Sequence, residues 1–270
     1  MKSTRTLMTA GLLLALPLLA TAQDFNWHGR LAPGKTLEIR GVNGSIDVSG
    51  GGGEAEVRAT KTARRSDPDS VEIKVIEHAE GVTICAVYPT PRDASRPNEC
   101  HAGGGGRMNT RDNDVNVNFS VKLPAGVKLS ANTVNGGVNV RGLDADVQAH
   151  TVNGSIKLRT DGRAEAQTVN GSIEASMGRA DWEGKNEFKT VNGAIHLELP
   201  GDLSTDVRAQ TVNGDIETDF PLTVRGRFSR RSLTGTIGGG GRELELETVN
   251  GGIRLSRRYS RSARPTASGG

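Results

Sequence analysis

The sequence predicts an all-β fold, a β-solenoid of the β-helix type whose coils are roughly twenty residues long. The first reason is a repeated four-residue motif, Thr-Val-Asn-Gly, which occurs at 133–136, 151–154, 168–171, 190–193, 211–214 and 248–251. A partial copy, Val-Asn-Gly, lies at 42–44, and a degraded copy, Leu-Thr-Gly, lies at 233–235. From the first full copy onward, successive copies are 16 to 22 residues apart. A repeat of this length is typical of a solenoid, in which each coil buries its apolar face by stacking on its neighbours.

The second reason is the alternation of apolar and polar residues on both sides of each motif. Residues 146–151 alternate before one copy, and Ile156 and Leu158 continue the alternation after it. This period of two indicates strands with one buried face. Because Asn and Gly tolerate the positive φ of a tight corner, each motif is predicted to form a structural turn. The predicted turn residues are Asn43, Gly44, Asn135, Gly136, Asn153, Gly154, Asn170, Gly171, Asn192, Gly193, Asn213, Gly214, Asn250 and Gly251.

A hairpin meander is the alternative fold, because Asn-Gly between alternating runs is also a strong hairpin signal. A meander, however, does not need the same motif at every other corner. Stacked coils do, because equivalent residues then lie about 4.8 Å apart and identical side chains form ladders. We therefore expect coils that stack in chain order, with an irregular corner at 233–235 and the motif at 248–251 in the last coil.

The first 22 residues have the features of a secretory signal peptide. A basic start is followed by an apolar stretch over 7–19 and by a small-residue cleavage site, Ala-Thr-Ala, at 20–22. The apolar stretch is short for a membrane span, and we expect no transmembrane segment after cleavage. The mature protein is expected to begin at Gln23 and to be exported to the periplasm, the cell surface or the medium.

The mature chain is expected to have three sections. Residues 23–126 form a less regular N-terminal β section that continues or caps the solenoid, 127–256 form the repeat solenoid, and 257–270 form a basic disordered tail. Only 34% of the residues are hydrophobic and 3% aromatic, which suits the narrow core of a solenoid better than one large globular core. The formal charge of +3 comes from the two ends of the chain, because residues 23–256 alone carry −3.

Cys85 and Cys100 are the only cysteines in the sequence. In an exported protein, a pair of cysteines favours a disulfide. The bridge would close a loop that contains three prolines, and the chain-entropy model gives such a loop a stabilisation of about 3 kcal/mol. Two buried, reduced thiols are the alternative.

These motifs resemble a known family. The repeats of the form Thr-Val-Asn-Gly-x-Ile, together with the Leu-Pro-x-Gly segment that ends a strand at 121–126, are similar to the bacterial "putative adhesin" domain of unknown function. The resemblance covers roughly residues 35–256 and departs from the pattern at 233–235. It implies a β-solenoid-like fold and a place in the cell envelope, and it brings no catalytic residues with it.

No spacing of reactive side chains predicts a catalytic, cofactor or metal site. The five histidines lack metal-ligand spacing; they are His28, His78, His101, His150 and His196. The Asp-Asn-Asp sequence at 112–114 lacks the spacing of an EF-hand and indicates a solvated turn. One row of charged residues, each directly after a post-turn isoleucine, is predicted to form a cross-strand ladder: Lys157, Glu174, His196, Glu217 and Arg254.

The function expected from these features is that of an exported cell-envelope, adhesin-like protein with a non-catalytic binding or structural role. The alternatives are a polysaccharide-active enzyme on a β-helix scaffold and an envelope scaffold that polymerises end to end. No nucleic acid is expected as partner, because the arginine-rich stretches at 225–231 and 257–261 belong to an exported chain. The candidate partners are an envelope polysaccharide, an anionic lipid and another envelope protein, and a solvated tail without a partner is the alternative for 257–270.

Overall fold

The computed structural model describes residues 25–103, 106–224 and 229–258. The expected signal peptide, the expected mature N-terminus at Gln23 and residues 259–270 of the expected tail lie outside these ranges. The described residues form strands and one short 3-10 helix, η1 (Pro68–Ser70). Within them, no helix is long and apolar enough to cross a membrane.

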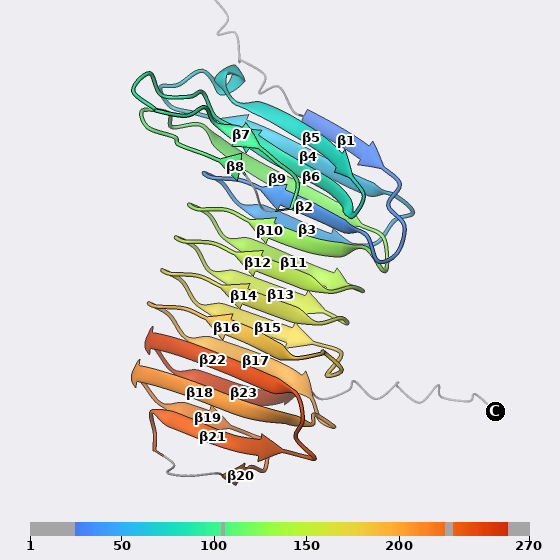
Figure 1. The fold of residues 1–270 in the computed structure, drawn as a ribbon, viewed down its shortest axis with the longest axis vertical. Helices are drawn as coiled ribbons and strands as arrows, with labels where there is room; N and C mark the ends of the chain where they lie inside the picture. The colour runs from blue at the N-terminus through green and yellow to red at the C-terminus, as the bar shows by residue number, and fades with distance from the viewer. Residues whose placement is uncertain (1–24, 104–105, 225–228, 259–270) are drawn as a thin grey trace, which may run out of the picture.

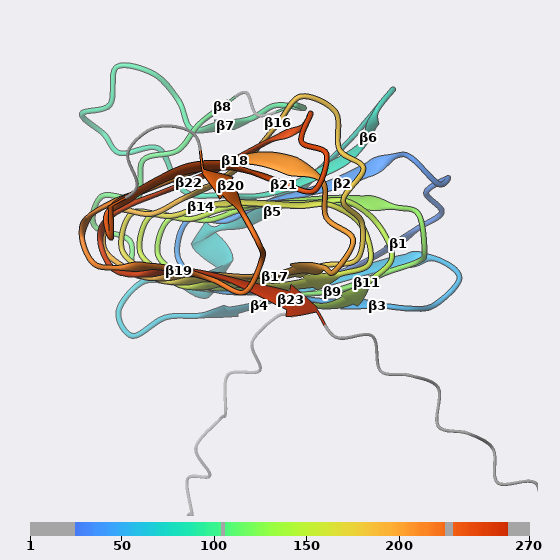
Figure 2. The same ribbon diagram turned by 90° about the horizontal axis from the view of Figure 1, so that it is seen from below.

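Two large sheets face each other along the whole length of the molecule (Figures 1 and 2). Sheet A consists, in order of neighbouring strands, of β1 (Phe25–Gly29), β4 (Ala55–Thr62), β9 (Asn116–Leu123), β3 (Ile46–Gly50), β11 (Val138–Leu143), β13 (Ile156–Thr160), β15 (Ile173–Met177), β17 (Ile195–Pro200), β23 (Ile253–Arg258) and β19 (Ile216–Thr218). Sheet B consists of β20 (Thr223–Val224), β21 (Ser232–Ile237), β18 (Thr205–Asn213), β22 (Glu243–Asn250), β16 (Lys185–Lys189), β14 (Ala164–Gln167), β12 (Val147–His150), β10 (Lys128–Asn132), β2 (Thr36–Arg40), β6 (Gly81–Val87) and β5 (Glu72–His78). A small third sheet pairs β7 (Glu99–Cys100) with β8 (Gly106–Arg107).

Each coil gives one strand to sheet B, turns at a Thr-Val-Asn-Gly corner, and gives the next strand to sheet A. The strands β12 and β13, for example, flank the corner at Asn153 but belong to different sheets. Equivalent strands of successive coils pair in parallel, as β13 does with β15 and β15 with β17. A meander would pair the two strands of each corner antiparallel, so the solenoid prediction is confirmed.

The core is a narrow strip between the two sheets, as the composition requires. Inward side chains repeat at the same register from coil to coil, so that Leu158 lies beside Ala175 and Ala175 beside Leu197. All three side chains are buried. Because each apolar residue is covered by its counterparts above and below, small aliphatic side chains suffice to exclude water.

Two side chains of each full corner motif, those of asparagine and threonine, bind an adjacent coil. The amide of Asn170 donates from Nδ2 to Oδ1 of Asn153 at 2.8 Å, and the same bond recurs along all seven corner asparagines at 2.7–2.8 Å. The hydroxyl of Thr168 donates to the carbonyl oxygen of Gly154 at 3.0 Å, and every full motif repeats this contact. The corner is therefore a stack of hydrogen-bonded ladders.

The reason expected for glycine at these corners is wrong at all but one of them. Only Gly44 has a positive φ, of 123°, and Gly171 lies outside the left-handed region. Glycine is needed there because the backbone of the adjacent coil passes too close for a side chain. A Cβ atom at Gly171 would lie 2.1 Å from the carbonyl oxygen of Gly154, and the other full motifs have the same approach at 2.0–2.1 Å.

The N-terminal section supplies the first coil and a cap. The first coil consists of β2, the corner at Asn43 and β3, which pair with β10 and β11 of the next coil. Above it, β6 pairs with β2 and β9 pairs with β3, again in parallel. Residues 88–115 connect β6 to β9 in the place where other coils have their motif. The antiparallel strands β5, β4 and β1 then close this end (Figure 1).

The connection 88–115 is fastened over the outer face of β6. Cys85 and Cys100 form a disulfide with a Cα–Cα distance of 6.0 Å. The hydroxyl of the buried Tyr88 donates to the carbonyl oxygen of Val115 at 2.8 Å, and burial raises the pKa of Tyr88 to about 12 against opposing hydrogen bonds with Asn43. With β2 and β5 on its two sides, every residue of β6 is buried.

The coils do not stack in chain order at the C-terminal end, which corrects the sequence expectation. The coil of β22 and β23 lies between the coil of β16 and β17 and the coil of β18 and β19. Asn250 therefore bonds to Asn192 on one side and to Asn213 on the other. The coil at 248–251 is thus an interior coil, and the motif at 211–214 belongs to the last one.

The degraded motif at 233–235 is also not a corner. These residues lie inside β21, which pairs antiparallel with the outer edge of β18. The chain leaves β19, forms this cap, and returns through 238–242 to insert β22 beside β16. The periodicity shows which segments form coils, but it holds no information on which neighbour a coil stacks against.

We predict that alanine at a corner glycine destabilises the protein according to its place in this corrected order. Gly171→Ala and Gly251→Ala in interior coils are each expected to cost about 1–3 kcal/mol, because the methyl group collides with main chain on the adjacent coil. Gly214→Ala is expected to cost less, since the last coil has a neighbouring coil on one side only. Urea denaturation measures all three.

Gly201→Ala is the matched control, because a Cβ atom there has no heavy atom within 4 Å. It is expected to leave the free energy of unfolding nearly unchanged. A loss at Gly251 as small as at Gly201, or a larger loss at Gly214 than at Gly171, would contradict the corrected order.

We further predict that removing the disulfide loosens the connection 88–115 and leaves the coils intact. The double variant Cys85→Ser/Cys100→Ser should lose about 3 kcal/mol, the chain-entropy value for a loop of this length. Hydrogen exchange should accelerate at 88–115 but not at the corners from Asn135 to Asn192, which contain no cysteine. Reduced wild-type protein should behave like the variant. Equal acceleration throughout would show that the bridge holds the whole solenoid together.

Candidate binding surfaces

The predicted turn residues and cysteines make their contacts with other parts of the same chain. The outer faces of the two sheets remain, and on both of them side chains from successive coils form straight rows. The row predicted as a charge ladder lies on sheet A, where Lys157 pairs with Glu174 at 3.1 Å and Arg254 with Glu217 at 2.8 Å. Its order is His196, Arg254, Glu217 at the C-terminal end, because of the inserted coil.

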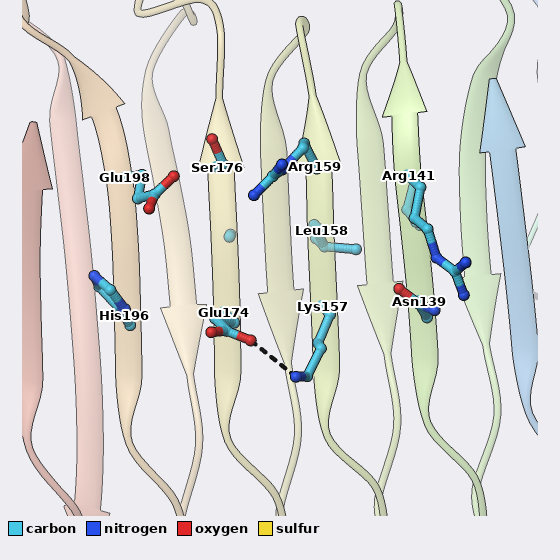
Figure 3. A pocket seen from close by; sticks show the side chains of 11 residues that line it. Asn139, Arg141, Lys157, Leu158, Arg159, Glu174, Ser176, His196 and Glu198 are labelled. Carbon is cyan, nitrogen blue, oxygen red and sulfur yellow. Dashed lines mark ion pairs between the residues drawn. The ribbon is translucent and has the colours of Figure 1, made fainter. Parts of the chain in front are cut away.

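A second row on sheet A lies two residues further along each strand and forms one side of a shallow groove of about 350 Å³ (Figure 3). Three members of this row lie side by side on three successive coils: Arg159 on β13, Ser176 on β15 and Glu198 on β17. Among the described residues, their side chains have no hydrogen bond or ion pair. The groove therefore offers a cation and a carboxylate on either side of Ser176, a residue that is only 6% exposed.

Two further groups extend the polar character of the groove at its N-terminal end. Arg141 of β11 carries a second guanidinium, which lies 3.6 Å from Oδ1 of Asp47. Asn139 donates from Nδ2 to the same carboxylate at 3.1 Å. In Figure 3, Arg141 and Arg159 are on neighbouring strands of sheet A, with Glu174 and Glu198 on the next two. The charge thus changes from positive to negative along the axis of the solenoid.

The groove continues into a larger hollow of about 1210 Å³ towards the C-terminal ends of the strands. Arg159, Ser176 and Glu198 line both. On the far side, Arg258 donates to Asp161 at 2.9 Å, which joins the strand of the inserted coil to the loop after β13. The two hollows together form a continuous polar trough over several coils.

The outer face of sheet B has a different organisation, because its charges neutralise one another. Lys185 contacts both Glu187, at 2.9 Å, and Glu245, and Lys189 contacts the same two carboxylates and Glu247. Partial desolvation raises the pKa of Glu187, but hydrogen bonds from Lys189 and Lys185 outweigh it and lower this pKa from its ordinary 4.5 to about 2. Contacts with Glu245 and Glu187 raise the pKa of Lys185. This network joins β16 to the inserted strand β22.

Neither surface has the features of a metal site or an aromatic sugar platform. In the described part of the chain, no group of three or more His, Cys, Asp or Glu side chains is placed to hold a metal ion. Trp182 is buried, with its Nε1 donating to the carbonyl oxygen of Glu243 at 3.1 Å. Trp27 is partly buried against the core at the N-terminal cap.

The family follows from a match over most of the chain. The model of the family described as "Toastrack DUF4097" matches residues 34–256. The chain belongs to this family. The matched range begins just before the first coil of the Toastrack domain and ends within β23, so it includes both the cap connection and the inserted coil.

The chain is similar to solved structures from several organisms. A "putative cell adhesion protein" from Clostridium sporogenes is 12% identical, with a TM-score of 0.47, over 87% of this chain and 100% of the other. A "putative adhesin" from Bacteroides fragilis is 11% identical, with a TM-score of 0.37, over 87% of this chain and 97% of the other. Among curated proteins, none matches the Toastrack chain.

Arg159, Ser176 and Glu198 belong to no motif or row predicted from the sequence. A signal for them exists, since each lies three positions after a post-corner isoleucine, as Arg159 does after Ile156. Superimposing the repeats on their corners therefore finds this row of the Toastrack domain. It does not reveal that the side chains are unpaired, because that depends on which rotamers face one another across coils.

We predict that the free energy of unfolding falls at acidic pH because Glu187 becomes protonated. Because its pKa is lower in the folded protein than the ordinary 4.5, ionised Glu187 stabilises the fold above pH 4.5, and this stabilisation is lost as the pH falls towards 2. The difference in free energy of unfolding between wild type and Glu187→Gln should therefore be largest above pH 4.5 and shrink towards pH 2. Urea denaturation across this pH range measures it.

The matched control is Glu198→Gln, because Glu198 has no ion pair among the described residues. At neutral pH, its free energy of unfolding should stay close to that of wild type, since no ion pair is lost. A constant difference for Glu187→Gln over the whole pH range would show that the lysine contacts do not stabilise the folded state.

Proposed function

We propose that the protein is an exported cell-envelope protein that binds an extended polysaccharide, without catalysis, along the outer face of sheet A. The observation that carries this proposal is the line of unpaired side chains, Arg159, Ser176 and Glu198, on three successive coils of the polar trough. Export is supported by the signal-peptide pattern at residues 1–22.

The geometry of the trough suits a linear polymer. Parallel strands are about 4.8 Å apart, so the same kind of outward position recurs at a short, regular distance along the solenoid. A chain that lies along the axis meets a new polar group at each coil, and many weak contacts add up. A small compact ligand would use only one or two of these groups.

The pattern of charge favours a polysaccharide over an anionic lipid or a nucleic acid. Positive groups at Arg141 and Arg159 are followed by negative groups at Glu174 and Glu198 within the same trough. A uniformly anionic surface would be attracted at one end and repelled at the other. Hydroxyl groups both donate and accept hydrogen bonds, so a hydroxyl-rich chain finds a partner at every one of these positions.

The two other functions fit less well with the described residues. End-to-end polymerisation would stack coil on coil, whereas antiparallel cap strands, not coils, form the N-terminal edges of both sheets and the C-terminal edge of sheet B. A glycoside hydrolase needs two carboxyl groups placed across one bond. In the trough, Glu174 is paired with Lys157 and Asp161 with Arg258, which leaves the carboxylates of Glu198 and of Asp202, the latter on the exposed turn after β17.

We predict that the double variant Arg159→Ala/Glu198→Ala binds polysaccharide at least about tenfold more weakly than wild type, since two charge-assisted hydrogen bonds are lost. The measurement is sedimentation with insoluble, lipid-free cell-wall polysaccharide, compared with vesicles that contain phosphatidylglycerol. The matched control is Arg208→Ala, an exposed arginine on the outer face of sheet B.

Loss of binding in the double variant with normal binding in the control supports the proposal. Binding to the vesicles alone would assign the trough to an anionic lipid instead. Equal binding of wild type and both variants, or no sedimentation at all, would reject the polysaccharide function. Release of soluble sugar during the incubation would favour the enzyme.

A further inference from the structure

A second hollow, separate from the trough, lies on the opposite face of the molecule beside the N-terminal cap. It has a volume of about 430 Å³, within the range of small-ligand sites. Its floor consists of outward side chains of β2, β10 and β12, and its edge includes His78 and Glu80 at the turn between β5 and β6. The regular outer face of sheet B is thus interrupted by the cap just where polar side chains gather.

At one side of the floor, a buried carboxylate is held in a fixed orientation. Glu38 is 7% exposed. The hydroxyl of Thr83 donates to its Oε2 at 2.8 Å, so this hydroxyl accepts from Nε2 of His78, which lies 3.1 Å away. The other oxygen, Oε1, is 3.9 Å from Nε of Arg40, beyond hydrogen-bond distance. The hydrogen bonds from His78 to Thr83 and from Thr83 to Glu38 therefore leave Oε1 of Glu38 as an acceptor that faces the hollow.

At the other side of the floor, a histidine is fixed in the same way. Asn132 donates from Nδ2 to the hydroxyl of Ser130 at 3.1 Å, which turns its Oδ1 towards Nδ1 of His150 at 3.2 Å. Nδ1 must then carry the proton, and Nε2 is left as an acceptor. Burial lowers the pKa of His150, opposed in part by the Glu165 carboxylate, so the ring is neutral at neutral pH.

The remaining lining completes a mixed set of donors and acceptors. Gln148 is exposed on β12 between Ser130 and Glu165 of the neighbouring strands, and its amide has no hydrogen bond among the described residues. It adds a donor and an acceptor in one plane. Arg40 adds a guanidinium from β2.

The chemistry of this lining excludes most ligand classes in turn. An apolar ligand has no Phe, Tyr, Trp or large aliphatic side chain to contact, because the lining residues other than Gly103 are polar. An anion is disfavoured by Glu38 and Glu80, and the guanidinium of Arg40, 3.9 Å from Glu38, offsets the attraction of these carboxylates for a cation. We propose that the hollow is a second binding site, specific for a short neutral saccharide, whose vicinal hydroxyl groups match the planar carboxylate and amide groups of Glu38 and Gln148.

This site differs from the trough in the part of a glycan that it recognises. The trough is open along the axis and takes the middle of a chain, whereas this hollow ends at the turn between β5 and β6. It therefore fits the end of a chain or a free oligosaccharide. The inference does not rest on the polysaccharide function of sheet A, and either site can fail without the other.

The test is saturation-transfer NMR of the full-length protein with a panel of neutral sugars, namely the methyl glycosides of glucose, galactose, mannose and N-acetylglucosamine, and their β-linked disaccharides. Glucuronate and spermidine serve as the anionic and cationic probes. Gln148→Ala should weaken binding of the best neutral sugar by about threefold to tenfold, as expected for lost hydrogen bonds. Gln210→Ala, an outward glutamine of the same sheet on β18, is the matched control.

A neutral sugar that saturates, binds more weakly to Gln148→Ala and binds normally to Gln210→Ala supports the site. Thermal unfolding of both variants checks that they are folded. Glu38→Gln is a second test of binding, since it keeps the shape of the side chain and weakens the acceptor. The proposal is overturned if no neutral sugar on the panel shows saturable transfer, if glucuronate or spermidine binds better, or if the two glutamine variants lose binding equally. Normal sedimentation of Gln148→Ala with cell-wall polysaccharide would show that the two sites are independent.

Discussion

The hydrogen bonds at the corners set the spacing and the register of the whole solenoid. At each corner the asparagine amide and the threonine hydroxyl bind the adjacent coil, and the glycine lets the two backbones approach closely. Because side chains alternate between faces along a strand, a slip of one residue would turn the core outward and the polar rows inward. The corner ladders prevent that slip at every layer. They therefore also align the outward rows, and the trough on sheet A is a consequence of the same register.

The sequence predicts those features that a local repeat encodes. The strands, the corners and the row of charges from Lys157 to Glu174 all follow from positions counted from the nearest motif. The sequence suggests a positive φ as the reason for glycine at Gly171, and this reason is wrong. A positive φ is a property of one residue, whereas the close approach that requires glycine there depends on where the adjacent coil lies. The same limit applies to Asn250. The motif around Asn250 has the same sequence as the other corners, and only the tertiary structure places Asn250 between Asn192 and Asn213.

The two candidate sites differ in how far a sequence reveals them. Arg159, Ser176 and Glu198 share one place in the repeat, so superposition of the repeats brings them together. Glu38, His78 and His150 come from a regular coil, the cap and another coil, and their only common property is that the topology brings them to one hollow. His78 and His150 carry no ligand-like spacing because the contacts that orient them, with Thr83 and Asn132, fall at unrelated distances along the chain.

The insertion of the 243–258 coil separates the order of assembly from the order of synthesis. A chain that emerges from its N-terminus can add each coil up to Asn192 to a finished layer. The coil that follows, with Asn213, cannot take its final place, because the layer beneath it is encoded 37 residues later. Until then the exposed edge of β16 and β17 has no partner. The last two coils therefore reach their final places together. A chain truncated before β22 would lack the coil against which β18 and β19 stack.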